Sequence, residues 1–338
     1  MILMRRLLYY LVAAALLPLS ACGQRQDAGT GRVVVAYVTS WSNVMPDPQY
    51  MTHINYAFGH VDSTFDAVRI DNPDRLRSIA ALKKDSPSLN VMLSVGGWGS
   101  GNFSEMVADE ALRKSFCASC ARAVADFDLD GIDIDWEYPT SNMAGISASP
   151  DDTENFTLLM RDLREALGPD KFLTIATSAT AQYIDYKAIV GYLDFVNVMA
   201  YDMSMGDSHH SGLYPSAYSA EMTSDGAVKA HLAAGVPREK LVMGMPFYGR
   251  GTRRFGRYVN YDAVAADGYT VCWDEVSKVP FIVDSLRNYV FGFENPRSLG
   301  IKCQYIVDEG LHGGMYWDYS GDNAEHDLAR TVRDGLLK

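Results

Sequence analysis

Three acidic side chains recur at every second position in a short run that otherwise reads as a buried strand. Asp133, Asp135 and Glu137 alternate with apolar residues in "GIDIDWEYP" (131–139). Side chains alternate across a strand, so the three carboxyls share one face, roughly 7 Å apart at successive positions. Like charges this close raise one another's pKa, so the outermost carboxyl can hold a proton at neutral pH. The spacing predicts acid–base chemistry with Glu137 as the general acid.

A purely structural role explains these acids less well, because moving unpaired carboxylates out of water is very costly. The alternative is an acidic ladder neutralised by basic residues or by a metal, but the strand contains no Lys or Arg. His209 and His210, on a later loop, have poor spacing for a metal site and no carboxylate cluster to complete it. We therefore expect no metal and no cofactor.

The elements that must position this strand form a regular alternation. Strand-like runs lie at 33–38, 53–58, 90–95, 131–136, 172–177, 194–199, 241–246 and 313–317. Helical patterns lie between most of them, at 73–84, 104–127, 151–167, 183–191, 225–234 and 298–310. This order predicts an α/β fold, a (β/α)8 TIM barrel. In such a barrel the three carboxyls point inward and Glu137 lies at the C-terminal end of its strand, where barrel active sites are found.

Two long segments leave this alternation. Residues 200–224 form a loop after the sixth strand, and residues 250–297 separate the seventh strand from the last of these helices. The second segment contains "GYTVCWDEVSKVPFIV", which reads as a small hairpin. We therefore expect at most a very small insertion between strands seven and eight, and a shallow wall beside the site.

The first residues predict export. Arg5 and Arg6 precede an apolar stretch too short to span a bilayer comfortably, and Leu19-Ser20-Ala21-Cys22 resembles a bacterial lipoprotein cleavage box. The interpretation is a lipoprotein signal peptide at 1–21, a lipidated Cys22, a flexible tether at 22–31 and one catalytic domain at 32–338. The protein would then be a monomer, exported and lipid-anchored to a bacterial cell envelope membrane at the outer membrane or cell surface. An ordinary secretory signal is the alternative.

Charge limits the partners. The whole chain carries a net charge of −12, and cleavage after residue 21 would remove two arginines and no acid. Such a surface repels nucleic acid, so a nucleic-acid partner is not expected, whereas a neutral substrate is compatible.

Four cysteines remain besides Cys22. Cys117 and Cys120 lie in a helical pattern and are interpreted as small core residues rather than as a zinc or redox pair. A disulfide between Cys272 and Cys303 is left open by the sequence.

Five motifs in order resemble glycoside hydrolase family 18, the chitinase and endo-β-N-acetylglucosaminidase family. Residues 130–137 resemble its DGxDxDxE signature, 94–97 its SxGG element and 199–202 its MxYD motif. The other two are "GMPFYGR" (244–250) and "GGMYWDYSGD" (313–322), and the resemblance spans roughly residues 32–335. One of the shorter motifs alone would be weak, but five in family order are very specific.

The resemblance implies retaining, substrate-assisted hydrolysis without an enzymic nucleophile. Glu137 would protonate the glycosidic oxygen, and the 2-acetamido oxygen of the substrate would attack the anomeric carbon. Asp135 would orient the acetamide nitrogen, while Asp133 would exchange a hydrogen bond with Asp135 and tune its protonation. Tyr201 would donate to the acetamide carbonyl. Only a sugar with an N-acyl group at C2 carries this nucleophile, so the partner would be an oligo- or polysaccharide containing N-acetylglucosamine.

The resemblance also implies a set of substrate-binding residues. Trp317 would be the floor on which the sugar before the cleaved bond stacks. Asp202 and Arg250 would hold hydroxyls or position the acid, with a surface salt bridge as the alternative. Met199 would line the barrel. The remaining candidates are aromatic residues at strand ends, of which the last two could equally fill the barrel interior: Trp98, Tyr138, Tyr37 and Phe58.

The short insertion makes a deep groove doubtful and favours a more open cleft. Chitin oligosaccharides are the expected substrate, and endo-β-N-acetylglucosaminidase action on the chitobiose core of N-glycans is the second hypothesis. Peptidoglycan-type glycans also stay open. The third hypothesis is a non-hydrolytic lectin on the same fold, and the presence of Glu137 disfavours it.

Overall fold

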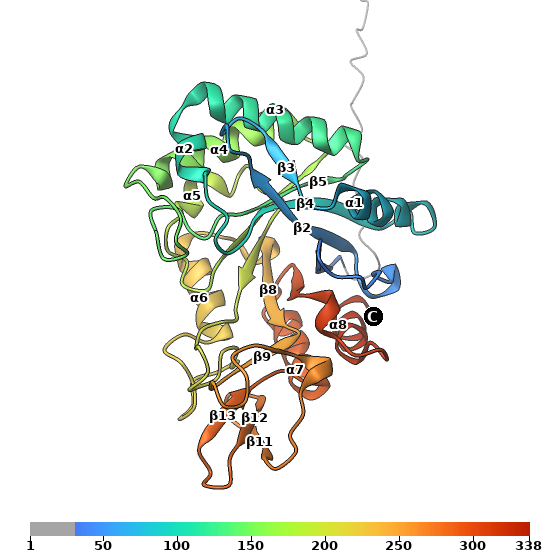
Figure 1. Cartoon of the computed structure of the whole chain (residues 1–338), viewed down its shortest axis with the longest axis vertical. Helices are drawn as coiled ribbons and strands as arrows, with labels where there is room; N and C mark the ends of the chain where they lie inside the picture. Colours follow the sequence, from blue (N-terminus) through green and yellow to red (C-terminus); the bar gives the residue numbers. More distant parts are fainter. Residues whose placement is uncertain (1–30) are drawn as a thin grey trace, which may run out of the picture.

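Eight parallel strands form a closed barrel in the computed structural model, which describes residues 31–338 (Figure 1). They are β1 (Val33–Thr39), β2 (His53–Val61), β4 (Asn90–Gly96), β5 (Gly131–Asp135), β6 (Phe172–Ser178), β7 (Phe195–Met199), β8 (Leu241–Pro246) and β14 (Gly313–Trp317). The order is β1-β14-β8-β7-β6-β5-β4-β2, and pairing of β1 with β2 closes the ring. A short strand, β3 (Val68–Ile70), pairs antiparallel with β2. The predicted barrel is confirmed.

The N-terminal predictions lie outside the described residues. The signal peptide at 1–21, the lipidation site Cys22 and nearly all of the tether at 22–31 fall in this part of the chain and stay predictions. Within residues 31–338, no helix is both long enough and apolar enough to cross a membrane.

The helices occupy the predicted segments, with two differences. They are α1 (Pro73–Ala80), α2 (Phe103–Ala108), α3 (Glu110–Asp126), α4 (Asp152–Leu167), α5 (Tyr186–Ile189), α6 (Ser224–Ala234), α7 (Pro296–Asp308) and α8 (Asp327–Leu337). The single helix expected at 104–127 is divided at Asp109, whose extended backbone ends α2 and whose carboxylate accepts hydrogen bonds from the first turn of α3. Helix α8 was not expected.

The barrel separates two apolar cores. Ile132, Ile134 and Trp136 belong to the large core between strands and helices, and Trp136 stacks on Phe103 of α2 at 5.2 Å. A smaller cluster fills the barrel interior, where Asp133 and Asp135 also lie, 0% and 3% exposed. The alternation predicted for this strand is confirmed.

The insertion after β8 is larger than the expected hairpin. The hairpin is present as β11 (Thr270–Asp274) and β12 (Val279–Val283). It is extended by β13 (Tyr289–Gly292), β9 (Tyr248–Gly251) and β10 (Val259–Asn260) into a five-stranded antiparallel sheet of order β10-β9-β13-β12-β11. Its own small core contains Ile282, Phe291 and Phe293. The sheet projects from one end of the molecule beside α7 (Figure 1), and it makes a more substantial wall than expected.

No disulfide bond links this sheet to α7 in the described residues. Cys272 of β11 and Cys303 of α7 are both free, as are Cys117 and Cys120. The disulfide that the sequence left open does not form.

A buried ion pair joins the insertion to α7 and to the loop after β7. Lys302 and Glu294 are in contact and both side chains are 0% exposed. Ser211 donates a hydrogen bond of 2.6 Å to Glu294 Oε1. Removing one member of a buried pair leaves an uncompensated charge, which costs about 3–5 kcal/mol.

We expect Lys302→Met to lower the free energy of unfolding by about 3–5 kcal/mol because Glu294 would stay buried without its cation. Urea unfolding followed by circular dichroism measures this loss. Lys114→Met is the matched control, because Lys114 forms an exposed pair with Glu110 and should barely move the midpoint. Equal midpoints for Lys302→Met and Lys114→Met would contradict the assignment.

Candidate active site

Asp133 is enclosed by hydrogen-bond donors from four other strands of the barrel. Its Oδ2 accepts from Tyr37 Oη and Ser94 Oγ, both at 2.8 Å. Its Oδ1 accepts from Thr174 Oγ1 at 2.6 Å and Asn197 Nδ2 at 3.2 Å. The strand register explains part of this cage, because Ser94 on β4 and Thr174 on β6 pair directly with Asp133 on β5. Burial raises the pKa of Asp133, and the donors oppose that rise.

Asp135 lacks the hydrogen bond that the sequence analysis expected from Asp133. No such bond occurs in the described chain, because the cage already occupies both oxygens of Asp133, and Asp135 Oδ1 is buried without a hydrogen-bond partner. Burial, with the nearby charges of Glu137 and Asp133, raises the pKa of Asp135 well above its ordinary value. The unpartnered Oδ1 leaves Asp135 with a buried acceptor for which the described residues supply no donor.

Glu137 follows β5 at the mouth of the barrel and is half-buried. Burial raises its pKa to about 7, the Tyr138 hydroxyl acts in the opposite direction, and the charge of Asp202 raises it further. A carboxyl with this pKa is part protonated near neutral pH, so it can both give and take a proton.

Tyr201 and Asp202 follow β7. In the barrel, β7 and β4 lie on opposite sides of β5, the strand that Glu137 follows. The Tyr201 hydroxyl has only a weak contact, 3.9 Å to Met315 Sδ, and so remains available to a ligand. Asp202 accepts from Tyr248 Oη and from Arg250 Nε, both at 2.7 Å. Burial opposes ionisation of Asp202, but His210 and Arg250 outweigh it and hold its pKa below the usual range.

Asp202 and Arg250 form an ion pair beside Tyr248, in which the Arg250 side chain is 18% exposed and Asp202 is 35% exposed. Their expected role in holding substrate hydroxyls or positioning the acid stays a prediction. Met199, predicted to line the barrel, packs against the interior cluster.

Aromatic rings cover the mouth of the barrel around Trp317. Phe58 stacks beneath Trp317 with ring centroids 5.6 Å apart at 19°, and Tyr37 lies 5.7 Å away. Both are buried, so they support Trp317 from below and fill the barrel. Trp41 and Trp98 are 64% and 62% exposed, which leaves their faces open to a ligand.

Tyr138 stacks on Tyr183 at 5.1 Å and 7°. This contact fixes its ring beside Glu137, in agreement with a place in the site.

Two glycines are required where β4 ends in the sequence Ser-Val-Gly-Gly (94–97). Gly96 has φ 131° and a Cβ there would lie 2.0 Å from the backbone oxygen of Asp135. Gly97 has φ 93°, and its Cβ would lie 2.6 Å from the Phe58 ring. The Gly97 amide donates to that same Asp135 oxygen at 2.8 Å. Any larger residue would displace the carboxyl strand or the support of Trp317.

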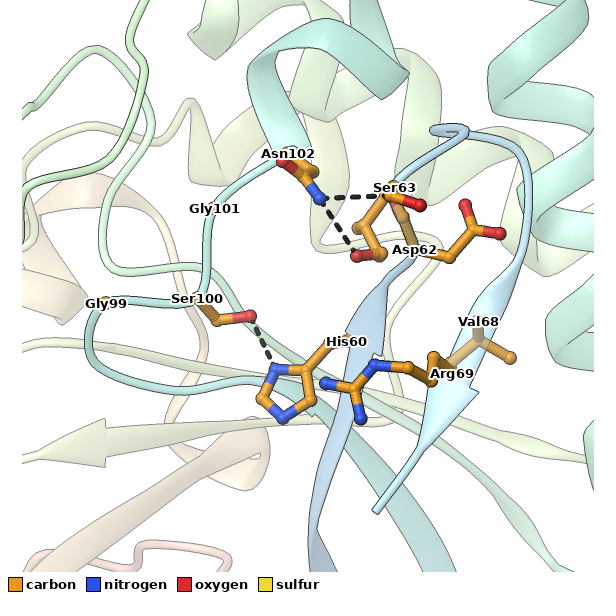
Figure 2. Close-up of a pocket in the computed structure, with 10 residues that line it drawn as sticks. His60, Asp62, Ser63, Val68, Arg69, Gly99, Ser100, Gly101 and Asn102 are labelled. Carbon is orange, nitrogen blue, oxygen red and sulfur yellow. Dashed lines mark hydrogen bonds between the residues drawn. The ribbon is translucent and has the colours of Figure 1, made fainter.

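A cavity of about 650 Å³ lies beside this centre rather than at Glu137. It is lined by the ends of β2 and β3 and by residues 99–102 (Figure 2). His60 contacts Ser100 at 2.8 Å and Asp71 at 2.9 Å, and its ring lies 6.2 Å from Phe58. These polar groups satisfy one another, so we place the chemistry at Glu137, where the proton affinities are shifted and a buried oxygen is unpartnered.

Several site residues were missed from the sequence. Thr174 and Asn197 lie at inward positions of predicted strands, so the same alternation that selected Asp133 could have found them. Tyr248 lies within the motif at 244–250 and His210 on the loop after β7, but no sequence pattern indicates that they meet Asp202, because the contacts join distant segments. In the described range no group of three or more His, Cys, Asp or Glu side chains could hold a metal ion.

We expect Asp202→Asn to lower the pKa of Glu137 from about 7, because it removes a fixed negative charge that disfavours ionisation of Glu137. The titration of the Glu137 carboxyl carbon, followed by NMR, measures the shift. Asp207→Asn, an exposed acid on the same loop, is the control and should leave that titration in place. A Glu137 pKa that stays constant or rises in Asp202→Asn would refute the coupling.

Comparison with known proteins agrees with this geometry. The family model described as "Glycosyl hydrolases family 18" matches residues 33–322. Chitinase A1 of Niallia circulans is 30% identical over 400 residues, which cover 88% of this chain and 57% of that protein. The chain thus spans little more than half of the length of that relative.

Two further relatives match over more of their own length. Chitotriosidase-1 of Mus musculus is 30% identical, with 91% of this chain and 79% of that protein covered. The solved structure of a glycoside hydrolase family 18 N-acetylglucosaminidase from Paenibacillus barengoltzii superposes with a TM-score of 0.81 at 34% identity, covering 90% of this chain and 100% of that one. With its family model spanning the barrel from β1 to the end of β14, this chain belongs to glycosyl hydrolases family 18.

Proposed function

We propose that this protein is a chitinase-like glycosidase that cleaves β-1,4 bonds next to N-acetylglucosamine units in chitin oligosaccharides. The observation that carries the proposal is Glu137, a carboxyl with a pKa of about 7 at the mouth of the barrel. Trp317 lies across the ring from it, because β14 and β5 are four strands apart in either direction. The relatives' names, chitinase, chitotriosidase and N-acetylglucosaminidase, support a substrate built from N-acetylglucosamine.

In the first step Glu137 gives its proton to the glycosidic oxygen as the bond to the anomeric carbon breaks. The 2-acetamido oxygen of the sugar on Trp317 forms the new bond to that carbon, giving an oxazolinium ion and a departing alcohol. The Tyr201 hydroxyl, which has only a weak sulfur contact in the protein, would hold the acetamide oxygen in place for attack.

Asp135 would stabilise the charge that develops on the acetamide nitrogen. Its unpartnered Oδ1 is a buried acceptor that can take the N–H of the substrate. Asp133 stays fixed in its cage and supplies a negative charge beneath Asp135. Asp202 stays ionised beside Glu137 and keeps the proton affinity of that residue high.

In the second step Glu137, now ionised, takes a proton from water as the water oxygen attacks the anomeric carbon. The bond from the acetamide oxygen breaks and the acetamide is restored. Two displacements at one carbon retain the configuration, and Glu137 ends the cycle protonated.

We expect Glu137→Gln to lower hydrolysis of chitin oligosaccharides by at least about 100-fold, because amide nitrogen cannot deliver the proton. Oligosaccharide binding, measured by calorimetry, should stay close to the wild-type affinity. Glu165→Gln in the last turn of α4, an exposed acid, is the control. Wild-type turnover by Glu137→Gln would exclude Glu137 as the acid.

The stereochemistry of the first product is a separate expectation. Proton NMR of a fresh digest should show the β-anomer of the new reducing end before mutarotation, because two displacements preserve the configuration. Initial release of the α-anomer would mean a single displacement by water, and the proposed role of the acetamide group would be wrong.

A further inference from the structure

Tyr258 is an exposed aromatic residue beside Trp317 that neither a barrel strand nor a sequence motif supplies. It lies between β9 and β10 of the insertion, immediately before Val259, and is 41% exposed. Its hydroxyl interacts with the Trp317 side chain. The five-stranded sheet therefore reaches the floor of the site through this residue.

Tyr258 is held in a fixed position although it faces solvent. Its ring stacks on Tyr248 with centroids 4.3 Å apart at 16°. The Arg250 guanidinium lies 5.3 Å from the Tyr248 ring and 5.1 Å from the Tyr258 ring. Arg250 is in turn fixed by Asp202. A rigid, exposed ring with a hydroxyl is the type of side chain that binds a pyranose, by contact with its apolar face and by hydrogen bonds.

The topology indicates which sugar would reach it. Glu137 on the β5 side must face the bond that is cleaved, so the sugars before that bond extend away from β5. They extend toward β14, whose neighbours in the ring are β1 and β8. Trp41 follows β1, and Tyr258 belongs to the insertion after β8. Both residues lie next to Trp317, Trp41 with ring centroids 6.4 Å apart and Tyr258 through its hydroxyl.

We propose that Tyr258 is a specificity-determining residue that contacts the sugar immediately preceding the one on Trp317. Through it the insertion selects donors of at least two N-acetylglucosamine units over a single unit. This inference rests on the proposed function and deepens it.

The test compares fluorogenic glycosides that carry one, two or three N-acetylglucosamine units. Tyr258→Ala should lower kcat/KM for the two-unit and three-unit glycosides about tenfold, as expected for loss of one hydrogen bond and a ring contact. The one-unit glycoside should change by less than about twofold, because its sugar ends at Trp317. Tyr258→Phe keeps the stack on Tyr248, so it should retain part of the preference for two units.

Tyr218→Ala is the matched control. Tyr218 is also a tyrosine with 41% exposure, but its ring packs on Phe281 and Tyr289 rather than on Tyr248. It should leave all three glycosides unchanged. If the one-unit glycoside turns over too slowly to follow, its binding is measured by NMR titration instead. The Glu137→Gln variant and the double variant Glu137→Gln/Tyr258→Ala should then bind it with equal affinity.

An equal loss on one-unit and two-unit glycosides would overturn the inference, since Tyr258 would then act by supporting Trp317. No loss on the two-unit glycoside would overturn it as well. Failure of the proposed function gives a different result: the wild-type protein would release no fluorophore from any of the three, and Glu137→Gln would behave as the wild type does.

Discussion

A buried carboxylate with four hydrogen-bond donors is the interaction on which the rest of this site depends. Asp133 is 0% exposed, and a negative charge in that place would be very unfavourable without partners. Tyr37, Ser94, Thr174 and Asn197 supply those partners from β1, β4, β6 and β7. Because the donors come from separate strands, the cage exists only when the barrel is closed in its correct register. Folding and the electrostatics of the site are therefore linked.

The cage sets a different environment for each of the three acids along β5. Asp133 has both oxygens satisfied, Asp135 has a buried oxygen without a partner, and Glu137 reaches the half-buried mouth. All three have raised pKa values, mainly through burial. Their positions along the strand then give them different roles. Asp133 is a fixed charge, Asp135 accepts the N–H of the substrate amide, and Glu137 is the proton donor. Asp202, kept ionised by His210 and Arg250, maintains the raised pKa of Glu137 from the other side.

Sequence periodicity predicted those features that depend on regular secondary structure alone. The eight barrel strands and the inward direction of Asp133 and Asp135 follow from alternation and were correct. Contacts between distant segments were not accessible in this way: Tyr248 and His210 meet Asp202, and Tyr258 meets Trp317, only after the chain has folded. The four donors around Asp133 could not be counted from one strand because they lie on other strands of the barrel, and the hydrogen bond expected between Asp133 and Asp135 stays a prediction. The insertion was underestimated because β9, β10 and β13 are too short to give a period of their own.

The central claim is that this barrel delivers a proton to a sugar that carries its own attacking group. Its most direct test is a series of chitobiose glycosides in which the acetyl group of the sugar on Trp317 bears zero, one, two or three fluorine atoms. Fluorine withdraws electrons from the acetamide oxygen, so the account predicts that kcat/KM falls progressively across the series while the affinity of Glu137→Gln for the same compounds changes little. A kcat/KM that is independent of fluorination would contradict it, because the acetamide oxygen would then take no part in bond formation.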